Sequence, residues 1–555
     1  MRRTLLAALI AAASGAAVIT APVAAANEGQ VPARYLSQQI DWKPCFDPNH
    51  LPPGLPADAA RLECGSFTAP RDWNRPDDKI DLTIAVSRLR PKTGTPKASV
   101  LVNPGGPGGP GRTLPLNFLG RTKLVDNMEL VGFDVRGTGD STNVTCGGGL
   151  DIGADLDYRD RSAGNVDLML DSAKLTAQYC QVKSGELGKY VNTEQTVRDL
   201  DLLRALIGRE KIDWIGYSGG TWLGAYYATY FPQHVDKFVL DSNAQFTTTW
   251  QQSFHWQSLG FERRFREDFL PWLARYDSTY HLGATPEQAR QTYETLRAKL
   301  AANPLTLNGQ KVGPVTLDVQ IVNAMYSAKR FDGLARVIGA LRTLADQPDT
   351  SPASQGVLAA RAALSALPRN EMASGPKPVS DDAYLSTFMA ITCNDTPWHG
   401  GRAALVEDSA KQGAKYPLLG WATISQPCAS WDRPALTMPT PSGAGVPPIL
   451  MVQDTHDPAT PYEGALLAHQ SFANSRLLTA VDQGDHGVYA LSGNTCVDTV
   501  VEAFLVNGTT PASDVTCGGV PLPAPGPSAE GLSANGDSSL DQIAEYRDAA
   551  GRMPR

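Results

Sequence analysis

The stretch of residues 212–227 constrains the fold more than any other part of the chain. It starts with an apolar run, continues as Gly-Tyr-Ser-Gly-Gly at 216–220, and ends in small and aromatic residues. This order predicts a buried strand, a tight turn and a closely packed helix, with the Ser218 hydroxyl held above the sheet edge. The positive end of the helix dipole would face the same point, which suits an oxyanion. The alternative is an ordinary strand–helix connection without chemistry.

Short apolar runs alternate with helical periodicity on both sides of this motif. Apolar strands that alternate with helices indicate an α/β fold, with a mostly parallel sheet that is flanked by helices. The active site of such a sheet lies at the carboxyl ends of its strands. The other predicted strands are 80–86, 98–102, 130–133, 238–241, 448–453 and 476–481.

The character of the sequence changes after about residue 245. Strand-like runs largely disappear, and helical periodicity dominates as far as about 389. This pattern predicts a large helical cap that is inserted between two strands and covers the active site. Residues 367–380, rich in Pro, Gly and polar residues, predict an exposed loop within it. The predicted cap helices are 258–276, 286–302, 317–328 and 331–346.

The N-terminus has the pattern of a secretory signal peptide. Arg2 and Arg3 precede an apolar segment, and the alanines at 24–26 supply small residues for cleavage. No later stretch is apolar for long enough to span a bilayer, so we expect a secreted, extracellular protein. The expected segments are 1–26 signal peptide, 27–244 first part of the core, 245–395 cap, 396–510 second part of the core, and 511–555 C-terminal tail.

Charge and cysteine content restrict the possible partners and cofactors. The net charge of −8 argues against nucleic acid or an anionic membrane as the partner. No spacing typical of a metal site is present, so we expect neither metal nor cofactor. Eight cysteines in an exported chain favour disulfide bonds between neighbours. The expected pairs are Cys45 with Cys64, Cys146 with Cys180, Cys393 with Cys428, and Cys496 with Cys517.

Two late loops supply the partners that a nucleophilic serine needs. A serine hydroxyl requires an imidazole base, and the imidazole requires a carboxylate that orients it. In parallel-sheet hydrolases the acid and then the histidine follow the serine on loops after late strands. Here one such loop carries Asp454 and Asp457, and the next carries His486. Asp457 is favoured because it lies three residues into its loop, whereas Asp454 lies directly at the strand end. Ser218, Asp457 and His486 are therefore the predicted catalytic triad.

The glycine-rich turn at 103–111 has two possible interpretations. Its Gly-x-Gly-x-x-Gly spacing matches a dinucleotide site, but Pro107 and Pro110 remove two of the N–H groups that would surround a pyrophosphate. The turn is better interpreted as an oxyanion loop after an early strand. We assign the N–H groups of Gly106 and Gly219 as the two donors.

These motifs together resemble the secreted bacterial tripeptidyl aminopeptidases, serine exopeptidases of the α/β-hydrolase fold that are related to proline iminopeptidases. The resemblance spans about residues 40 to 500 and rests on Asn-Pro-Gly-Gly-Pro-Gly-Gly at 103–109, Asp-Val-Arg-Gly-Thr-Gly at 134–139, the serine motif, Asp-Pro-Ala-Thr-Pro-Tyr at 457–462 and Gly-Asp-His-Gly at 484–487. It implies release of short peptides, and tripeptides in particular, from free protein or peptide N-termini. It assigns the same triad. We expect a monomer.

Other functions stay open from the sequence. The same triad could serve an esterase or lipase, or a prolyl-type aminopeptidase that releases single residues. A non-catalytic binding module on a hydrolase scaffold is disfavoured because all three triad residues are present. An aminopeptidase must also bind the substrate ammonium, for which acidic cap residues are candidates. Of Glu262, Glu267, Asp268 and Asp395, we favour Asp395 for substrate binding, because the disulfide expected at Cys393 would fix it.

Overall fold

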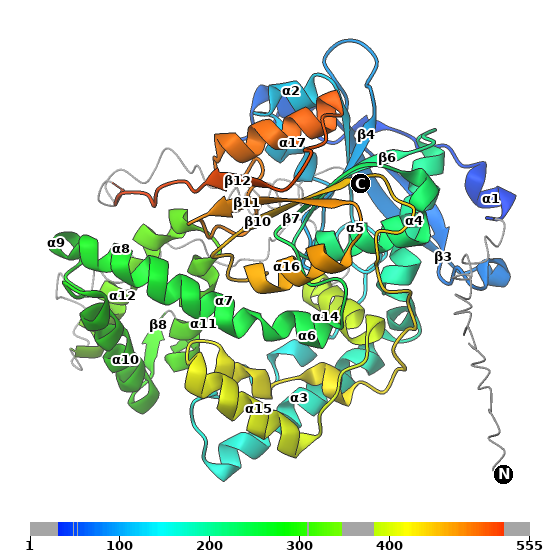
Figure 1. Cartoon of the computed structure of the whole chain (residues 1–555). Coiled ribbons are helices and arrows are strands. Elements are labelled where there is room, and N and C mark those ends of the chain that lie inside the picture. Colours follow the sequence, from blue (N-terminus) through cyan, green and yellow to red (C-terminus); the bar gives the residue numbers. More distant parts are fainter. Residues whose placement is uncertain (1–30, 48, 53, 308–309, 347–381, 527–555) are drawn as a thin grey trace, which may run out of the picture.

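The molecule is built around one sheet of ten strands (Figure 1). In the computed structural model, residues 31–47, 49–52, 54–307, 310–346 and 382–526 are described. The strand order is β1-β2-β3-β5-β4-β6-β7-β10-β11-β12, antiparallel from β1 to β5 and parallel from β5 onward. The strands are β1 Lys43–Pro44, β2 Leu62–Pro70, β3 Asp81–Leu89, β4 Ser99–Asn103, β5 Glu129–Phe133, β6 Ile212–Tyr217, β7 Val235–Asp241, β10 Ile449–Asp454, β11 Ser475–Val481 and β12 Val515–Gly518.

The predicted strands are all confirmed, and the sheet extends beyond them at both edges. The sequence analysis misses β2, which pairs with β3 along its whole length although apolar and polar residues are mixed along it. It also assigns 515–518 to the C-terminal tail, whereas these residues form β12 beside β11. β12 carries a single buried residue, Cys517, so its sequence lacks the apolar run that marks an inner strand.

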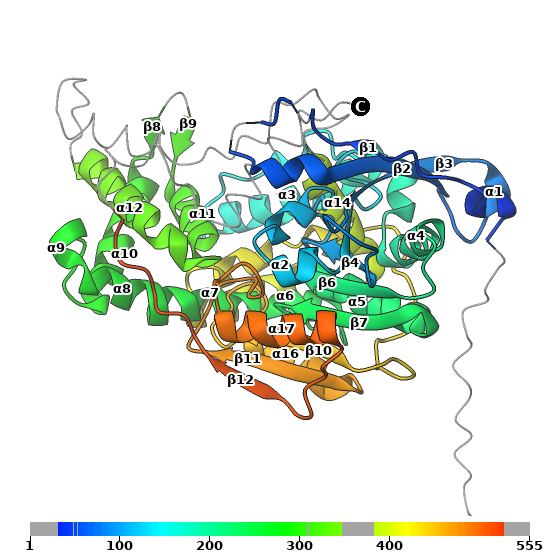
Figure 2. The same ribbon diagram turned by 90° about the horizontal axis from the view of Figure 1, so that it is seen from above.

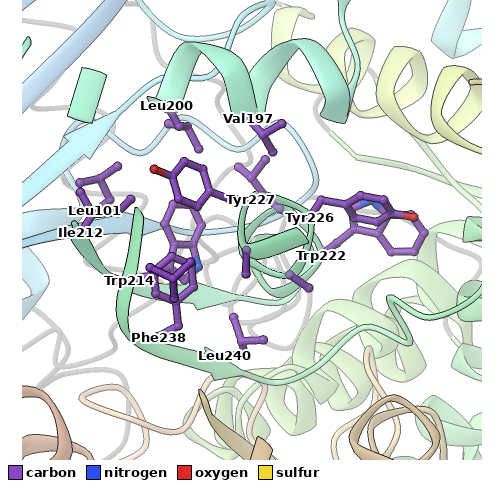
Figure 3. Packing of buried hydrophobic residues seen from close by; sticks show 14 of the residues in the cluster. Leu101, Val197, Leu200, Ile212, Trp214, Trp222, Tyr226, Tyr227, Phe238 and Leu240 are labelled. Atoms are coloured by element: carbon purple, nitrogen blue, oxygen red, sulfur yellow. The ribbon is translucent and has the colours of Figure 1, made fainter. Parts of the chain in front are cut away.

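Alternate side chains of the central strands pack on opposite faces of the sheet. Trp214 and Leu240 join one apolar cluster, and Ile215 and Val239 join the other. Figure 3 shows Trp214 and Leu240 among the side chains that face α5. All four side chains are fully buried, as expected for strands covered on both sides. The helices on the first face are α4 Thr193–Leu206, α5 Gly219–Tyr230 and α16 Tyr462–Ser471, and those on the second are α2 Thr122–Val125 and α17 Thr495–Asn507.

A long segment, 242–448, separates β7 from β10, although these two strands are neighbours in the sheet, and its described residues are mostly helical. Within this segment, the described residues between 261 and 341 form a cap with its own apolar core beside the sheet (Figure 2). The predicted cap helices are present within one to a few residues, and the predicted loop 367–380 lies outside the described residues. The helices of the segment are α6 Trp250–His255, α7 Gln257–Arg263, the π-helical turn η7 Arg264–Phe269, α8 Leu270–Arg275, α9 Asp277–Tyr280, α10 Pro286–Ala302, α11 Pro314–Met325, α12 Phe331–Asp346, α14 Ala383–Asp395, α15 Arg402–Lys415 and the short turns η8 Ala328–Arg330, η9 Gly420–Ile424 and η10 Pro427–Ser430.

The disulfide pairing predicted from the sequence is confirmed. All eight cysteines form bonds between neighbours along the chain. Within the described ranges, no helix has the length and apolar character that crossing a membrane requires. The four bonds join Cys45 to Cys64, Cys146 to Cys180, Cys393 to Cys428, and Cys496 to Cys517.

Candidate active site

Ser218 lies where β6 turns sharply into α5, as the sequence predicts. Its backbone has φ 54° and ψ −121°, a strained conformation that few residues other than glycine adopt. The Ser218 N–H donates to the carbonyl of Asp241 at the end of β7 (3.0 Å), which holds the turn in place. The N-terminus of α5 therefore begins directly behind the serine, where its dipole favours negative charge.

Two glycines allow α5 to lie this close to β6. A Cβ on Gly216 would be 2.3 Å from Trp214 Nε1, and a Cβ on Gly224 would be 2.5 Å from the same atom. The indole instead donates its N–H to the carbonyl of Gly220 (3.3 Å). Any side chain at either glycine would push the helix away and move the serine with it.

Gly106 and Gly219 meet beside the serine. A Cβ on Gly219 would lie 2.8 Å from the nitrogen of Pro107, so the glycine-rich turn passes directly over the start of α5. Gly106 has φ 109°, a conformation that glycine adopts without strain. Within the described part of the chain, neither N–H donates a hydrogen bond. Both glycines line the same cavity as Ser218, so the two N–H groups are placed to receive an oxyanion.

Asp457 and His486 form a close pair. Both carboxylate oxygens lie 3.0 Å from His486 Nδ1. Asp457 is fully buried, and it also accepts hydrogen bonds from the N–H groups of Ala459 (2.9 Å) and Thr460 (2.8 Å). These donors fix the carboxylate opposite the imidazole. With Nδ1 donating to the carboxylate, Nε2 is the nitrogen free to act as a base.

Ser218 and His486 share the same surroundings, although their side chains are not hydrogen-bonded to each other in the described residues. Thr460 lines the cavity with Ser218, and its Oγ1 lies 3.4 Å from His486 Nδ1. Tyr326 lines it too, and its ring meets the His486 ring edge-on with centroids 5.3 Å apart. Serine–histidine contacts are often long in ligand-free enzymes and shorten when substrate binds.

Asp454, the alternative acid, occupies a different environment. It is fully buried at the end of β10, and neither of its oxygens has a hydrogen-bond partner among the described residues. Burial raises the pKa of Asp454 well above its ordinary value, and the nearby charge of Asp457 raises it further. Of the two aspartates, only Asp457 contacts His486.

Side chains from neighbouring strands hold two loops: the acid loop after β10, which carries Asp457, and the histidine loop after β11, which carries His486. Gln453 accepts the N–H of Asn243 (2.7 Å) and donates to the carbonyl of Thr460 (2.8 Å) in the acid loop. Asp241 accepts the N–H groups of Val488 (3.0 Å) and Tyr489 (2.7 Å), just after the histidine. Burial raises the pKa of Asp241 to about 7. Both loops are thus tied to the rigid sheet, as a preorganised site requires.

A cavity of about 400 Å³ opens at Ser218 beneath the inserted segment. One wall comes from α6 and α14, and another from the chain around η10, including the disulfide residue Cys428. None of the described residues that line the cavity is charged, and six of them are aromatic. These rings belong to Trp250, Phe254, Tyr326, Tyr384, Phe388 and Trp398.

The acids that the sequence analysis considers for ammonium binding do not line this cavity. Asp395, the favoured one, is buried behind its wall and accepts hydrogen bonds from Thr193 N–H (2.8 Å), Thr193 Oγ1 (2.6 Å) and Trp250 Nε1 (3.1 Å). Burial raises the pKa of Asp395 to about 6. These contacts give Asp395 a structural role at the start of α4, because an ammonium would have to displace Thr193 or Trp250.

The other three acids are also engaged elsewhere. Glu262 pairs with Arg266 and accepts the N–H of Leu418 (2.9 Å). Asp268 pairs with Arg264 and His456, and the side chain of Glu267 is 59% exposed.

Sequence reasoning misses the residues through which the cap reaches the histidine. The carbonyl of Tyr326 accepts the N–H of His486 (2.8 Å), and Arg264 pairs with Asp485 (2.6 Å). Both come from cap segments whose only sequence signal is helical periodicity. No group of three or more His, Cys, Asp or Glu side chains suited to a metal ion occurs in the described residues.

Two family models match the chain. The model described as alpha/beta hydrolase fold matches residues 98–336, which contain Ser218. The model described as TAP-like protein matches residues 416–517, which contain Asp457 and His486.

Three curated proteins are similar to the chain over most of their length. Tripeptidyl aminopeptidase of Streptomyces lividans is 32% identical over 508 residues, which cover 89% of this chain and 89% of that protein. Serine protease Hip1 of Mycobacterium tuberculosis (strain ATCC 25618 / H37Rv) is 29% identical and covers 87% of this chain and 91% of that protein. Carboxylesterase B of the same strain is 29% identical, and the matched residues cover 89% of this chain and 94% of that protein.

Proposed function

The chain belongs to the tripeptidyl aminopeptidase family of α/β-hydrolases, and we propose that it releases tripeptides from the free N-termini of extracellular proteins. The family predicted from the motifs is thereby confirmed, and the chain is a serine exopeptidase. The tripeptide unit, the extracellular substrates and the roles of individual residues belong to the proposal.

In the proposed mechanism His486 Nε2 removes the proton of Ser218 as the serine oxygen attacks the scissile carbonyl. Asp457, 3.0 Å from Nδ1, stabilises the imidazolium that forms. The N–H groups of Gly106 and Gly219 bind the oxyanion, and the loss of one such donor costs about 3 kcal/mol of transition-state stabilisation. His486 then protonates the leaving amine, and water releases the acyl-enzyme by the same steps.

The partly covered cavity at Ser218 is the observation that carries the proposal. It has a volume of about 400 Å³, and the inserted segment covers it. A space of this size accommodates a short peptide segment. A cavity of this size favours short peptide segments, which is consistent with an exopeptidase. The cavity's aromatic, uncharged lining also favours apolar side chains.

Products from one defined decapeptide test the proposal directly. Mass spectrometry should find the first three residues as the initial product, followed by the next three. An N-acetylated copy of the same peptide should not be cleaved. Single-residue products would instead support a prolyl-type aminopeptidase, and cleavage of the acetylated peptide would contradict the N-terminal specificity.

Esterase activity is the second candidate, because one relative is named Carboxylesterase B and no charged residue lines the described cavity wall. Ester substrates need no ammonium site, and they use the same triad chemistry. Hydrolysis of p-nitrophenyl butyrate with no release from tripeptidyl p-nitroanilides would favour this candidate.

A further inference from the structure

A buried arginine of the cap links the loops of the acid and the histidine. Arg264, the first residue of the π-helical turn η7, is 1% exposed. Its Nη2 donates to Asp485 Oδ1 (2.6 Å), and its Nη1 donates to Asp268 Oδ2 (2.6 Å). Asp485 directly precedes His486. π-helical turns within α-helices often occur at functional sites.

The other carboxylate bound by Arg264, that of Asp268, connects the arginine to the acid loop. Asp268 lies 3.0 Å from Nδ1 of His456, which directly precedes Asp457. The N–H of His456 also donates to the carbonyl of Gln483 (2.8 Å), which joins the acid loop to the histidine loop. One guanidinium group thus connects, through two carboxylates, the residues adjacent to both Asp457 and His486.

The cap holds the histidine loop at further points. Asp485 accepts the N–H of Ala328 (2.8 Å) and the hydroxyl of Ser327 (3.2 Å), while the N–H of His486 donates to the carbonyl of Tyr326 (2.8 Å). The loop therefore lies between the sheet on one side and the cap on the other. Its position depends on both.

Gly484 in the Gly-Asp-His-Gly motif is required for this arrangement. A Cβ at this position would lie 2.6 Å from Arg264 Nη1 and 2.8 Å from the Cβ of His456. Only a glycine leaves room for the guanidinium between the two loops. The motif thus encodes the approach of the cap arginine as well as the histidine itself.

We infer that Arg264 is a positioning residue, which holds the cap, the acid loop and the histidine loop in the geometry that the triad requires. The inference rests on the proposed roles of Ser218, Asp457 and His486. The planar guanidinium group satisfies two carboxylates at once with fixed geometry, whereas a lysine ammonium is a single point charge. A displacement of about 1 Å of a catalytic group can cost about 10²-fold in rate. The guanidinium group of Arg264 contacts none of the described residues that line the cavity. Replacing Arg264 should therefore change substrate binding little.

The test uses R264K, R264M and D485A in the full-length enzyme. For each variant we would measure kcat and KM on a tripeptidyl p-nitroanilide, the labelling rate of Ser218 by a fluorophosphonate, and Tm. R264K should lower kcat about tenfold and R264M more, with KM changed less than twofold. D485A should behave like R264M, because it removes the contact between Arg264 and the histidine loop. The hydrogen bond from Arg264 to Asp268 remains in this variant. The labelling rate should fall by the same factor as kcat.

R297K is the matched control. Arg297 is another buried cap arginine that binds two carboxylates, Asp318 (2.9 Å) and Asp157 (2.5 Å), but it contacts neither triad loop. It should lower Tm about as much as R264K while kcat stays within twofold of the wild type.

The outcomes separate the inference from the proposed function. Folded R264K and D485A with wild-type kcat and labelling rate would overturn the inference, as would an equal loss of kcat in R297K. If R264M does not fold, R264K and D485A decide the question. A wild-type enzyme that fails to label at Ser218 would instead overturn the proposed function.

Discussion

Two aspartates three residues apart show how strongly the local surroundings decide the role of a carboxyl group. Asp457 is held by the N–H groups of Ala459 and Thr460 and lies 3.0 Å from His486. Asp454 is equally buried but has no hydrogen-bond partner in the described residues, so its neutral form is favoured. Asp454 makes no hydrogen bond to His486, so it does not orient the imidazole.

Replacing each aspartate by asparagine separates the two roles. D457N should lower kcat about 10⁴-fold, because an amide no longer selects the productive histidine tautomer. D454N should keep kcat within threefold, because Asp454 does not contact His486 and an amide of nearly the same shape takes its place. Steady-state hydrolysis of a tripeptidyl p-nitroanilide by both variants measures the difference. Equal losses in the two variants would show that Asp454 takes part in the chemistry.

At this scale the sequence predicted residues that belong to motifs and missed those that act through space. The triad candidates follow from the Gly-x-Ser-x-Gly turn and from the order of the late loops, which leave few other positions for an acid and a base. In the sequence, Asp395 is favoured only by its proximity to Cys393 along the chain. Its contact with Thr193, about two hundred residues away, depends on packing that no local pattern encodes.

At the scale of the elements, a disulfide bond joins α14 to η10, which both line the cavity at Ser218. Cys393 at the end of α14 is bonded to Cys428 in η10, and Cys428 lines the cavity. The bond therefore fixes the distance between two sides of the substrate site, besides restricting the unfolded chain.

Removal of this bond should affect stability and substrate binding together. The double variant C393A/C428A should lose about 3–4 kcal/mol of unfolding free energy, from a loop of 35 residues. Its KM should rise severalfold, because the wall that carries Cys428 is no longer fixed. The matched control is C45A/C64A, which removes a bond that closes a loop of 19 residues and whose cysteines do not line the cavity. It should lose about 3 kcal/mol with unchanged KM. Urea denaturation and steady-state kinetics check both, and an unchanged KM in the first variant would contradict the expectation.

The elements that the sequence predicted correctly are those with an internal signal. Inner strands such as β6 and β10 are mostly apolar and buried along their whole length, because both of their faces are covered. β2 and β12 lie toward the edges, where neighbours rather than side-chain pattern hold them in place. The π-helical turn η7 likewise has no signature distinct from that of the helices around it.

The whole molecule buries several carboxyl groups whose pKa values are raised. Burial raises the pKa of Asp213 and of Asp241 to about 7, that of Asp395 to about 6, and that of Asp454 well above its ordinary value. In the unfolded chain these groups lose their protons near pH 4. At these four groups the folded protein therefore binds more protons than the unfolded chain between pH 4 and pH 7.

Stability should consequently fall as the pH rises through this interval. We expect the free energy of unfolding, measured by urea denaturation, to be several kcal/mol lower at pH 8 than at pH 5. D454N should make this decrease smaller, because its amide has no proton to lose. D41N, at a side chain that is 77% exposed, serves as the control and should leave the slope unchanged. A stability that rises from pH 5 to pH 8 would show that these carboxyl groups are ionised in the folded protein.

The placement of β10 next to β7 has a consequence for folding during synthesis. The two strands pair side by side, yet about two hundred residues separate them along the chain. At a synthesis rate of about 5–20 residues per second, β7 has no partner on that edge for roughly 10–40 seconds. A half-made chain thus presents an open apolar strand, to which another nascent chain could add itself. Folding at the ribosome would have to keep that edge covered until β10, which leads into the loop of Asp457, has been synthesised.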